Sequence, residues 1–458
     1  MPFILPANTL SAGGYDVANS CIFDRASTDS MSKSMSDGSS IKGTFSAWIK
    51  VDGTGNEMNI LSHFQDTSNV FSIATSGSSV YVVDYNSGYS LQLATNRIMR
   101  DPSAWFHLYV AIDRSQGTAN NRNRIFINGV EETSFSNRTN YGQQTSGGHQ
   151  DAISMNDGDC TMYLGGLGDG NQMFGGYLAE VVWLDGTASA VTNFGEFDED
   201  SGIFKPIDVS GLSSSKGTNG FYLDFEDASN LGNDAFGGTD LTESNIASTN
   251  QTTDTCTNNF AVGNPLVQND LPAFSNGNLT YTSGSNNYKT GLSTIGVSSG
   301  KWFMEVLFVS GSTAIIGVVD EADFSSLNGN TAGAGFTTNS VGYYKDGTKW
   351  IADSESSYGA SYTANDTIGI ALDLDSGTKT VTFYKDGASQ GAINLPTTGT
   401  GTFFFAPGAY NSVLSANYGS PPFAISSGNT DANGYGNFEF TVPSGYYALN
   451  TKNLAEYG

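Results

Sequence analysis

Short runs of alternating apolar and polar residues, each closed by a glycine-containing turn signal, follow one another along most of this chain. In "TFSAWIKVDGTG" (44–55), Phe45 and Ala47 alternate with Ser46 and Trp48, and the run ends in Asp-Gly. In "RNRIFINGVEETSF" (122–135), Asn-Gly separates two strand patterns, which is the strongest short-range hairpin signal in a sequence. Because side chains alternate between the faces of a strand, this pattern predicts half-buried strands joined by tight turns. No long window has the helical period, so we expect an all-β protein.

One turn sequence occurs twice, as "YYKDG" at 343–347 and "FYKDG" at 383–387. The residues around the two copies share nothing further, which argues against an internal repeat. The second copy lies in "ALDLDSGTKTVTFYKDGASQG" (371–391), where turns follow one another about every ten residues, as in a β-sandwich meander. The repetition therefore reflects common turn chemistry, since Asp and Gly both suit the backbone of a tight turn.

Length and charge limit the classes of protein. At 458 residues the chain is too long for one hydrophobic core, so two or three domains are expected. Its 19 basic against 45 acidic residues give a formal charge of −26, which would repel nucleic acid and an anionic membrane surface. The N-terminal "MPFILPANTLSAGGYD" is a poor signal peptide, and no apolar run approaches a membrane span. Cys21, Cys160 and Cys256 are too sparse for a disulfide scaffold and are expected to be small buried residues.

Four strings in the first half carry a family resemblance. They are "FSAWIK" (45–50), "WFHLYVAID" (105–113), "IFINGV" (125–130) and "GGYLAEVVWLDGTA" (175–188). Their order and spacing resemble the laminin-G-like domain, a jelly roll of concanavalin A type. The resemblance implies an antiparallel β-sandwich over residues 20–228, preceded by an N-terminal arm, residues 1–19.

The second half resembles another family. The strings "GKWFMEV" (300–306), "IGV" (316–318) and "DTIGIALDLDSGTKTVTFYKDG" (366–387) resemble the SPRY domain in order and spacing. This implies a second concanavalin A-like sandwich over residues 270–425, followed by a C-terminal tail, residues 426–458. Residues 229–269 are rich in Gly, Asn and Thr and are interpreted as an extended linker, which Phe236, Ile246 and Phe260 could attach to a neighbouring domain.

Linker and tail strings, such as "NGFYLDFEDASNLGND" (219–234) and "PSGYYALNTKNL" (443–454), resemble structural proteins of tailed phages. The resemblance implies a virion protein, made in the host cytoplasm and released by lysis. We expect a tail fibre, spike or other surface appendage that binds a host-surface glycan or protein without catalysis. A capsid-decorating or adaptor protein is the alternative, and a glycan-degrading enzyme a lesser one. Expected partners are other virion proteins and further copies of the chain, as in the trimers of phage fibres.

Paired carboxylates bear on function here, because the concanavalin A-like sandwiches that both halves resemble include glycosidases. In "EFDED" (196–200), Glu196, Asp198 and Asp200 would share one face of a strand about 6–7 Å apart, a separation that suits an acid/base pair. The glycosidase signature, however, needs Glu where Asp200 stands. We therefore interpret the segment as an exposed acidic turn and expect no catalytic residues and no enzymatic activity.

Two candidate sites remain. In the SPRY-like half, Tyr343, Trp350 and Tyr358 are the candidate ligand-binding residues, since exposed aromatic rings stack on sugars or peptides; ordinary packing is the alternative. No cofactor is expected apart from calcium, for which Asp157, Asp159 and Asp169 are the candidate ligands. These aspartates lack a complete ligand signature, and turn formation by Asp and Asn is the interpretation that we favour.

Overall fold

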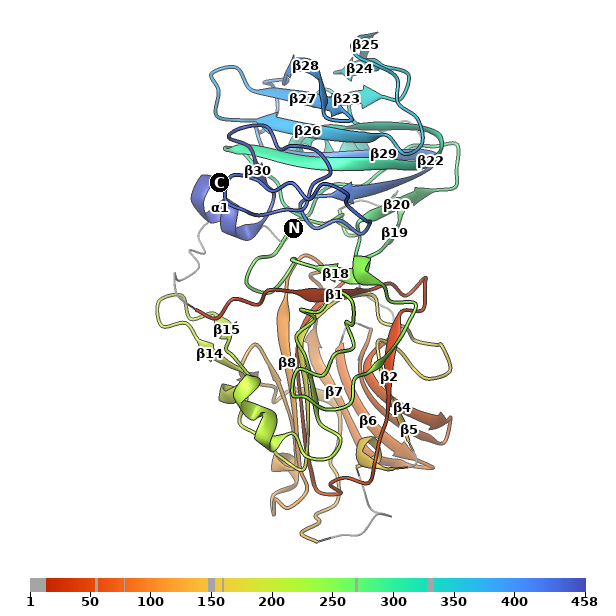
Figure 1. The fold of residues 1–458 in the computed structure, drawn as a ribbon, viewed down its shortest axis with the longest axis vertical. Coiled ribbons are helices and arrows are strands. Elements are labelled where there is room, and N and C mark those ends of the chain that lie inside the picture. Colours follow the sequence, from red (N-terminus) through yellow and green to blue (C-terminus); the bar gives the residue numbers. More distant parts are fainter. Residues whose placement is uncertain are drawn as a thin grey trace. The chain divides into compact units, whose positions relative to one another are not determined.

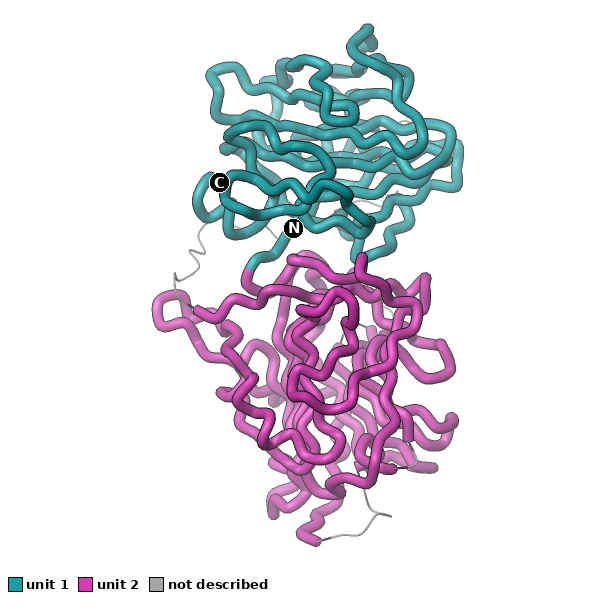
Figure 2. The backbone as a smooth tube through the Cα atoms, in the orientation of Figure 1, with its two compact units in different colours: residues 1–10, 258–458 teal, residues 11–257 magenta. Residues whose placement is uncertain are grey.

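The computed structural model describes residues 14–53, 57–77, 79–146, 153–158, 160–267, 271–327 and 333–458. Figure 1 shows a fold built almost entirely of strands, and Figure 2 shows its division into two compact units. Residues 11–257 form one unit, and residues 258–458 belong to the other. We call them the first and the second unit and describe each by itself.

The first unit contains two antiparallel sheets, sheet A and sheet B. Sheet A has the order β10-β9-β8-β3-β13-β1-β18, with β16 also paired to β13, and sheet B the order β11-β7-β6-β5-β4-β12-β2-β17. The strands of sheet A are β1 (Ser20–Phe23), β3 (Lys42–Val51), β8 (Phe106–Asp113), β9 (Asn123–Ile127), β10 (Val130–Glu131), β13 (Gly176–Asp185), β16 (Phe221–Leu223) and β18 (Gln251–Thr252). Those of sheet B are β2 (Ser30–Ser34), β4 (Met58–Asp66), β5 (Asn69–Ser76), β6 (Ser79–Asn86), β7 (Tyr89–Ile98), β11 (Phe135–Thr139), β12 (Thr161–Leu164) and β17 (Thr242–Ser244).

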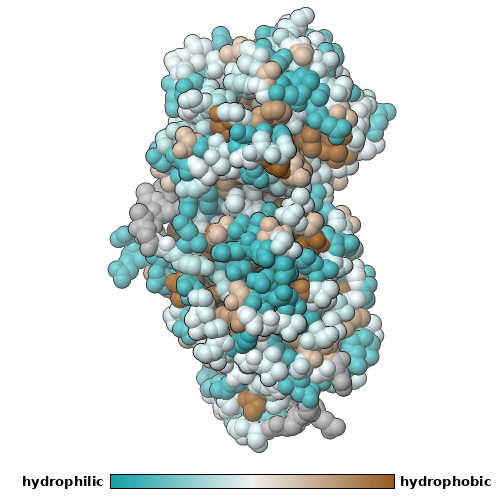
Figure 3. All heavy atoms as spheres, in the orientation of Figure 1, coloured by the Kyte–Doolittle hydropathy of each residue, from teal (hydrophilic) through white to brown (hydrophobic). Residues whose placement is uncertain are grey.

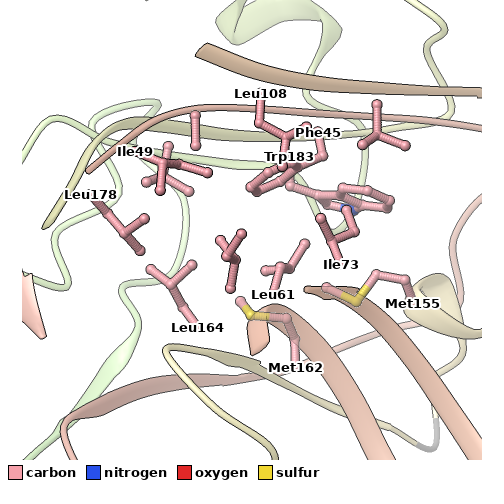
Figure 4. Packing of buried hydrophobic residues seen from close by; sticks show 14 of the residues in the cluster. Phe45, Ile49, Leu61, Ile73, Leu108, Met155, Met162, Leu164, Leu178 and Trp183 are labelled. Carbon is pink, nitrogen blue, oxygen red and sulfur yellow. The ribbon is translucent and has the colours of Figure 1, made fainter. Parts of the chain in front are cut away.

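The core of the first unit lies between these sheets. Phe45 and Ile49 of β3 point into it and meet Leu61 and Ile73 of sheet B (Figure 4), and all four are fully buried. The hairpin predicted at Asn-Gly is present, since Val130 pairs with Ile127 across a two-residue turn. Both turn residues, Asn128 and Gly129, have a positive φ, as a type I′ turn requires. The predicted all-β sandwich is confirmed.

The other face of sheet A is covered by the chain itself. The segment that follows β13 crosses this face and packs Phe194, Val209 and Phe236 against Tyr109 and Val182. Alternation of apolar and polar residues would suggest that one face of β3 is exposed. Both faces of β3 and β13 are nevertheless buried, because the covering segment packs on the face opposite the core. The covering segment contains β14 (Gly195–Phe197), β15 (Phe204–Pro206) and the 3-10 helices η4 (Val191–Asn193) and η5 (Ser210–Ser215). The remaining 3-10 helices of the unit are η1 (Ala119–Asn121), η3 (Ser154–Asn156) and η6 (Ser248–Asn250).

The segment 229–269, expected to be an extended linker, is instead divided between the units. Up to residue 257 it belongs to the first unit, where β17 pairs with β2 and β18 with β1. These strands are short and polar and pair through their backbones, so they leave no alternating pattern in the sequence. Phe236 and Phe260 are buried, as the sequence allowed, and Ile246 packs against the core. Near the N-terminus, the backbone N–H of Val17 donates a 3.1 Å hydrogen bond to the Thr257 hydroxyl. This part of the expected N-terminal arm therefore packs on the first unit.

The second unit is built on one long strand, β22 (Lys301–Asp320), which β29 (Phe403–Asn417) follows along its length. One half of β22 pairs with β26 (Thr367–Asp373) and the other with β23 (Ser340–Tyr344). The sheet therefore divides at β22 into two arms. The other strands are β19 (Ala273–Ser275), β20 (Thr280–Ser283), β21 (Lys289–Thr290), β24 (Thr348–Ile351), β25 (Ser354–Ser357), β27 (Thr380–Lys385), β28 (Ala388–Asn394) and β30 (Tyr447–Ala448).

The tail 426–458 packs against the rest of the second unit. Phe438 is fully buried against Phe303 of β22, with ring centroids 5.2 Å apart, and β30 pairs with β22 in parallel. The chain ends in helix α1 (Thr451–Tyr457), where the Asn450 side chain accepts the backbone N–H of Asn453 as an N-cap. The 3-10 helix η7 (Glu321–Leu327) follows β22. The structure describes no helix that is long and apolar enough to cross a membrane.

Candidate binding surface

The outer face of sheet B, opposite the core, carries a surface that the sequence analysis did not single out. Leu61, Ile73, Val82 and Leu93 of its central strands point into the core, so the residues between them point outward. Strand pairing arranges these outward residues in three rows across the sheet. The rows are Phe64–Val70–Tyr85–Tyr89, then Ser62–Ser72–Val83–Gln92, then Asn59–Ala74–Tyr81–Ala94.

Three tyrosines dominate this face. Tyr81 and Tyr85 lie four residues apart on β6 and therefore on the same side of the strand. Tyr85 meets Tyr89 of β7 edge to face, with ring centroids 5.0 Å apart, and Tyr89 is 50% exposed. The Tyr81 hydroxyl accepts a hydrogen bond from Gln92 Nε2 over 2.9 Å. The rings are thus held in place by neighbours while one ring stays accessible.

Small residues separate the aromatic rows. Ser62, Ser72 and Ala74 lie in the middle of the face and are buried among their larger neighbours. The loop 165–173 borders the face on the β4 side, where Ser62 Oγ donates to the Gly166 carbonyl over 2.7 Å. Asn59 Nδ2 likewise donates to Gln172 Oε1 over 2.7 Å. The result is a floor of small side chains with tyrosines on one side and a polar loop on the other.

The three rows contain no Asp, Glu, Lys or Arg, although the whole chain carries a formal charge of −26. Large hydrophobic side chains are rarely exposed elsewhere, and in the view of Figure 3 the hydrophobic residues form small separate groups. Among the described residues, the exposed large hydrophobics are Tyr89, Ile98, Val130, Phe197, Ile203 and Leu266. An uncharged face of tyrosine, serine and amide groups can stack on sugar rings and hydrogen-bond their hydroxyls.

The three aromatic residues predicted as a patch in the SPRY-like half do not form one. Gly342 pairs with Trp350 and Tyr343 with Lys349, so Tyr343 and Trp350 point to opposite faces of the sheet. Tyr343 is fully buried between Tyr358 and Phe383, with centroids 5.3 and 5.5 Å away. Trp350 packs edge to face against Phe336, with ring centroids 4.7 Å apart. Tyr343 is therefore a core residue, out of reach of a stacking ligand.

Of the three candidate calcium ligands, the structure describes Asp157 and Asp169. Asp169 accepts the backbone N–H and the side-chain amide of Asn171, each over 2.9 Å, which is a turn contact. Asp157 lies at the end of η3, where its carbonyl accepts the Cys160 N–H. Asp159 lies outside the described residues. Within the described ranges, no group of three or more His, Cys, Asp or Glu could hold a metal ion.

The acidic segment 196–200 is a turn in the structure. Asp198 accepts the backbone N–H of Ser201 over 2.9 Å, and Lys205 Nζ lies 3.3 Å from Asp198 and 3.4 Å from Glu196. These hydrogen bonds, above all those from Ser201, lower the pKa of Asp198 to about 2. Asp198 is therefore ionised near neutral pH and is not poised to donate a proton.

Sequence reasoning missed Tyr81, Tyr85 and Tyr89, but a signal was there. In "VYVVDYNSGY" (80–89), Tyr81 and Tyr85 alternate with Val80, Val82 and Asp84. Period-two alternation places the tyrosines on the solvent side of a strand whose other side is apolar. Large aromatic rings at strand positions that usually carry polar residues indicate a candidate interaction surface.

The arrangement of strands defines two antiparallel sandwich domains of concanavalin A type. Residues 26–191 match the family model described as the concanavalin A-like lectin/glucanases superfamily, and residues 301–421 match the SPRY domain. The chain therefore contains a laminin-G-like domain followed by a SPRY domain, as the two resemblances implied.

Matches among solved structures include two human SPRY domains and one bacterial protein. A human SPRY domain is 21% identical, and the match covers 32% of this chain and 94% of that one at a TM-score of 0.25. The SPRY domain of human HERC1 is 19% identical, and the match covers 33% of this chain and 90% of that one at a TM-score of 0.25. A putative carbohydrate binding protein from Bacteroides ovatus is 16% identical, and the match covers 50% of this chain and 58% of that one at a TM-score of 0.35.

Proposed function

We propose that this chain is a binding protein without catalytic activity, and that the outer face of sheet B contacts an uncharged glycan. The observation that carries the proposal is the uncovered row of Tyr85 and Tyr89 beside a floor of small side chains. Rings of this kind offer apolar faces to sugars, while Tyr81, Gln92 and Gln172 offer hydrogen bonds to sugar hydroxyls.

The absence of catalysis is part of the proposal. The acidic segment that could have served hydrolysis is engaged by Lys205 and Ser201, so it offers no free acid/base pair. The first family description covers lectins as well as glucanases, and the second names no reaction. Loop ends and sheet faces of rigid sandwiches are common places for recognition.

The setting that we propose is a virion. It rests on the resemblance of the strings at 219–234 and 443–454 to structural proteins of tailed phages. In that setting the chain is a tail fibre, spike or other surface appendage that binds the host surface, works as a homo-oligomer and contacts other virion proteins. A capsid-decorating or adaptor role is the second candidate. Imaging of an assembled particle separates them, because attachment proteins are distal whereas decorations cover the shell.

A glycan array probed with the whole chain tests the binding proposal. We expect neutral polysaccharides among the ligands, with binding that changes little with salt, because no charged side chain lies in the three rows. Tyr89→Ala should weaken binding about tenfold through the lost ring contact. Phe197→Ala is the matched control, since Phe197 is also 50% exposed but lies on β14. Equal loss in both variants, or none in either, contradicts the assignment of this face.

A further inference from the structure

A lysine and an aspartate far apart in the sequence meet on the covered face of sheet A. Lys50 of β3 and Asp254, two residues after β18, are separated by 204 positions. Lys50 Nζ lies 2.7 Å from Asp254 Oδ2, and the two side chains are 0% and 1% exposed. Solvent is therefore excluded from both the amine and the carboxyl group.

Neighbouring groups fix the geometry of this pair. Trp105 Nε1 donates a hydrogen bond to the other carboxyl oxygen, Asp254 Oδ1, over 3.0 Å. The Tyr177 ring lies 5.1 Å from Lys50 Nζ and is itself packed against Trp105. Ser20 Oγ holds the Asp254 backbone through a 2.6 Å hydrogen bond to its carbonyl. The amine and the carboxyl group are thus held in contact by the surrounding fold.

Burial of a charged pair is costly, because the desolvation of two ions offsets much of their attraction. Burial lowers the pKa of the Lys50 amine, although the Asp254 carboxylate opposes this effect. Transfer of one Nζ proton to Oδ2 across this 2.7 Å contact is the step that would leave the amine neutral. A neutral amine has the lone pair that nucleophilic attack requires.

We propose that Lys50 and Asp254 form an intramolecular amide cross-link in the folded chain. The Nζ lone pair attacks Cγ of the protonated Asp254 carboxyl group, and negative charge collects on Oδ1, where the Trp105 N–H donates. A second Nζ proton then moves to Oδ2, the Cγ–Oδ2 bond breaks, and Oδ2 leaves as water. One proton stays on the amide nitrogen, so no other reactant is needed. Fixed contact in a dry site supplies the effective concentration for an otherwise slow condensation.

The cross-link would join sheet A to the end of the first unit. Asp254 lies three residues before the division between the units at residue 257, so the bond would prevent strands between β3 and that point from separating freely. Such a link restricts the unfolded chain in the way that a disulfide does.

The intact mass of the purified whole chain tests the proposal. We expect a mass below that of the sequence by one water, and tandem mass spectrometry should find the peptide of Lys50 joined to that of Asp254. Lys50→Met should restore the full sequence mass. Asp254→Asn offers an independent readout, because condensation of an amide with Lys50 releases ammonia instead of water.

The measurement on the unaltered chain does not depend on whether either variant folds. A mass equal to that of the sequence overturns the proposal and leaves Lys50 and Asp254 as a buried ion pair. A loss of water that maps to another pair of residues overturns it as well.

Discussion

A buried carboxyl group, Glu305, is one of the contacts that hold the tail 426–458 on the second unit, and we expect this contact to weaken as the pH rises. Glu305 of β22 is fully buried. It accepts the backbone N–H groups of Glu439 and Phe440 over 2.9 and 2.8 Å, and Nδ2 of Asn417 over 3.3 Å. The perturbation is a change of pH, compared between the unaltered chain and Glu305→Gln.

Burial raises the pKa of Glu305 from 4.5 to about 7, although the two backbone N–H groups oppose the shift. A folded-state pKa above the unfolded one means that the folded state binds the proton more tightly. The contribution to stability is therefore complete below about pH 4.5 and is lost as the pH rises through 7. At 1.36 kcal/mol for each pKa unit, the loss amounts to about 3 kcal/mol.

Hydrogen exchange followed by mass spectrometry measures this loss in the whole chain. The amides of Glu439 and Phe440 report the opening of the tail directly, because their N–H groups bind the carboxyl group. After correction for the intrinsic pH dependence of exchange, their opening free energy should fall by about 3 kcal/mol between pH 4.5 and 8. Glu305→Gln cannot ionise, so its opening free energy should stay level over this range.

Glu305→Gln should also be about 1–2 kcal/mol less stable at pH 5, because its amide NH₂ cannot accept one of the two backbone N–H groups. Parallel pH dependences in the two proteins would refute the reasoning, since the slope would then come from other groups. A flat profile in both would show that Glu305 keeps an ordinary pKa.

Three further predictions concern packing and backbone. Leu178→Ala, a fully buried core change, should cost the first unit about 2–5 kcal/mol in urea unfolding, and a loss under 1 kcal/mol would contradict the packing. Asn450→Ala removes the N-cap of α1 and should cost about 1 kcal/mol, seen as faster exchange in 451–457 only. Gly129→Ala should destabilise the first unit because φ is +75° and the new Cβ would lie 2.4 Å from Phe204, whereas Gly88→Ala, with open space, should be nearly neutral in thermal melts.

Strand content and turn positions could be predicted because both are local properties. Asn128-Gly129 closes a two-residue hairpin as expected, and the alternation of Phe45, Ala47 and Ile49 places them in the core. The order of the family motifs was sufficient to indicate two sandwiches. Such features depend on residues close in sequence, so the pattern of one segment determines them.

Features that depend on distant segments could not be predicted. Lys50 alternates along β3 with core residues such as Ile49, yet it is buried against Asp254 and Tyr177, which come from distant segments that the local pattern does not show. The pairing of β17 and β18 was missed because their residues are polar. Tyr343 and Trp350 were grouped by nearness in sequence, and an odd separation across a hairpin placed them on opposite faces.

The pairing of β1 with β18 has a practical consequence. Residue 20 at the start of β1 faces Thr252 at the end of β18, so the chain enters and leaves this unit at one edge of sheet A. A unit whose two ends are neighbours can be placed in a surface loop of a host protein without stretching it. The first unit, residues 11–257, should therefore be transplantable as a cassette and displayed on an unrelated scaffold with its tyrosine face intact.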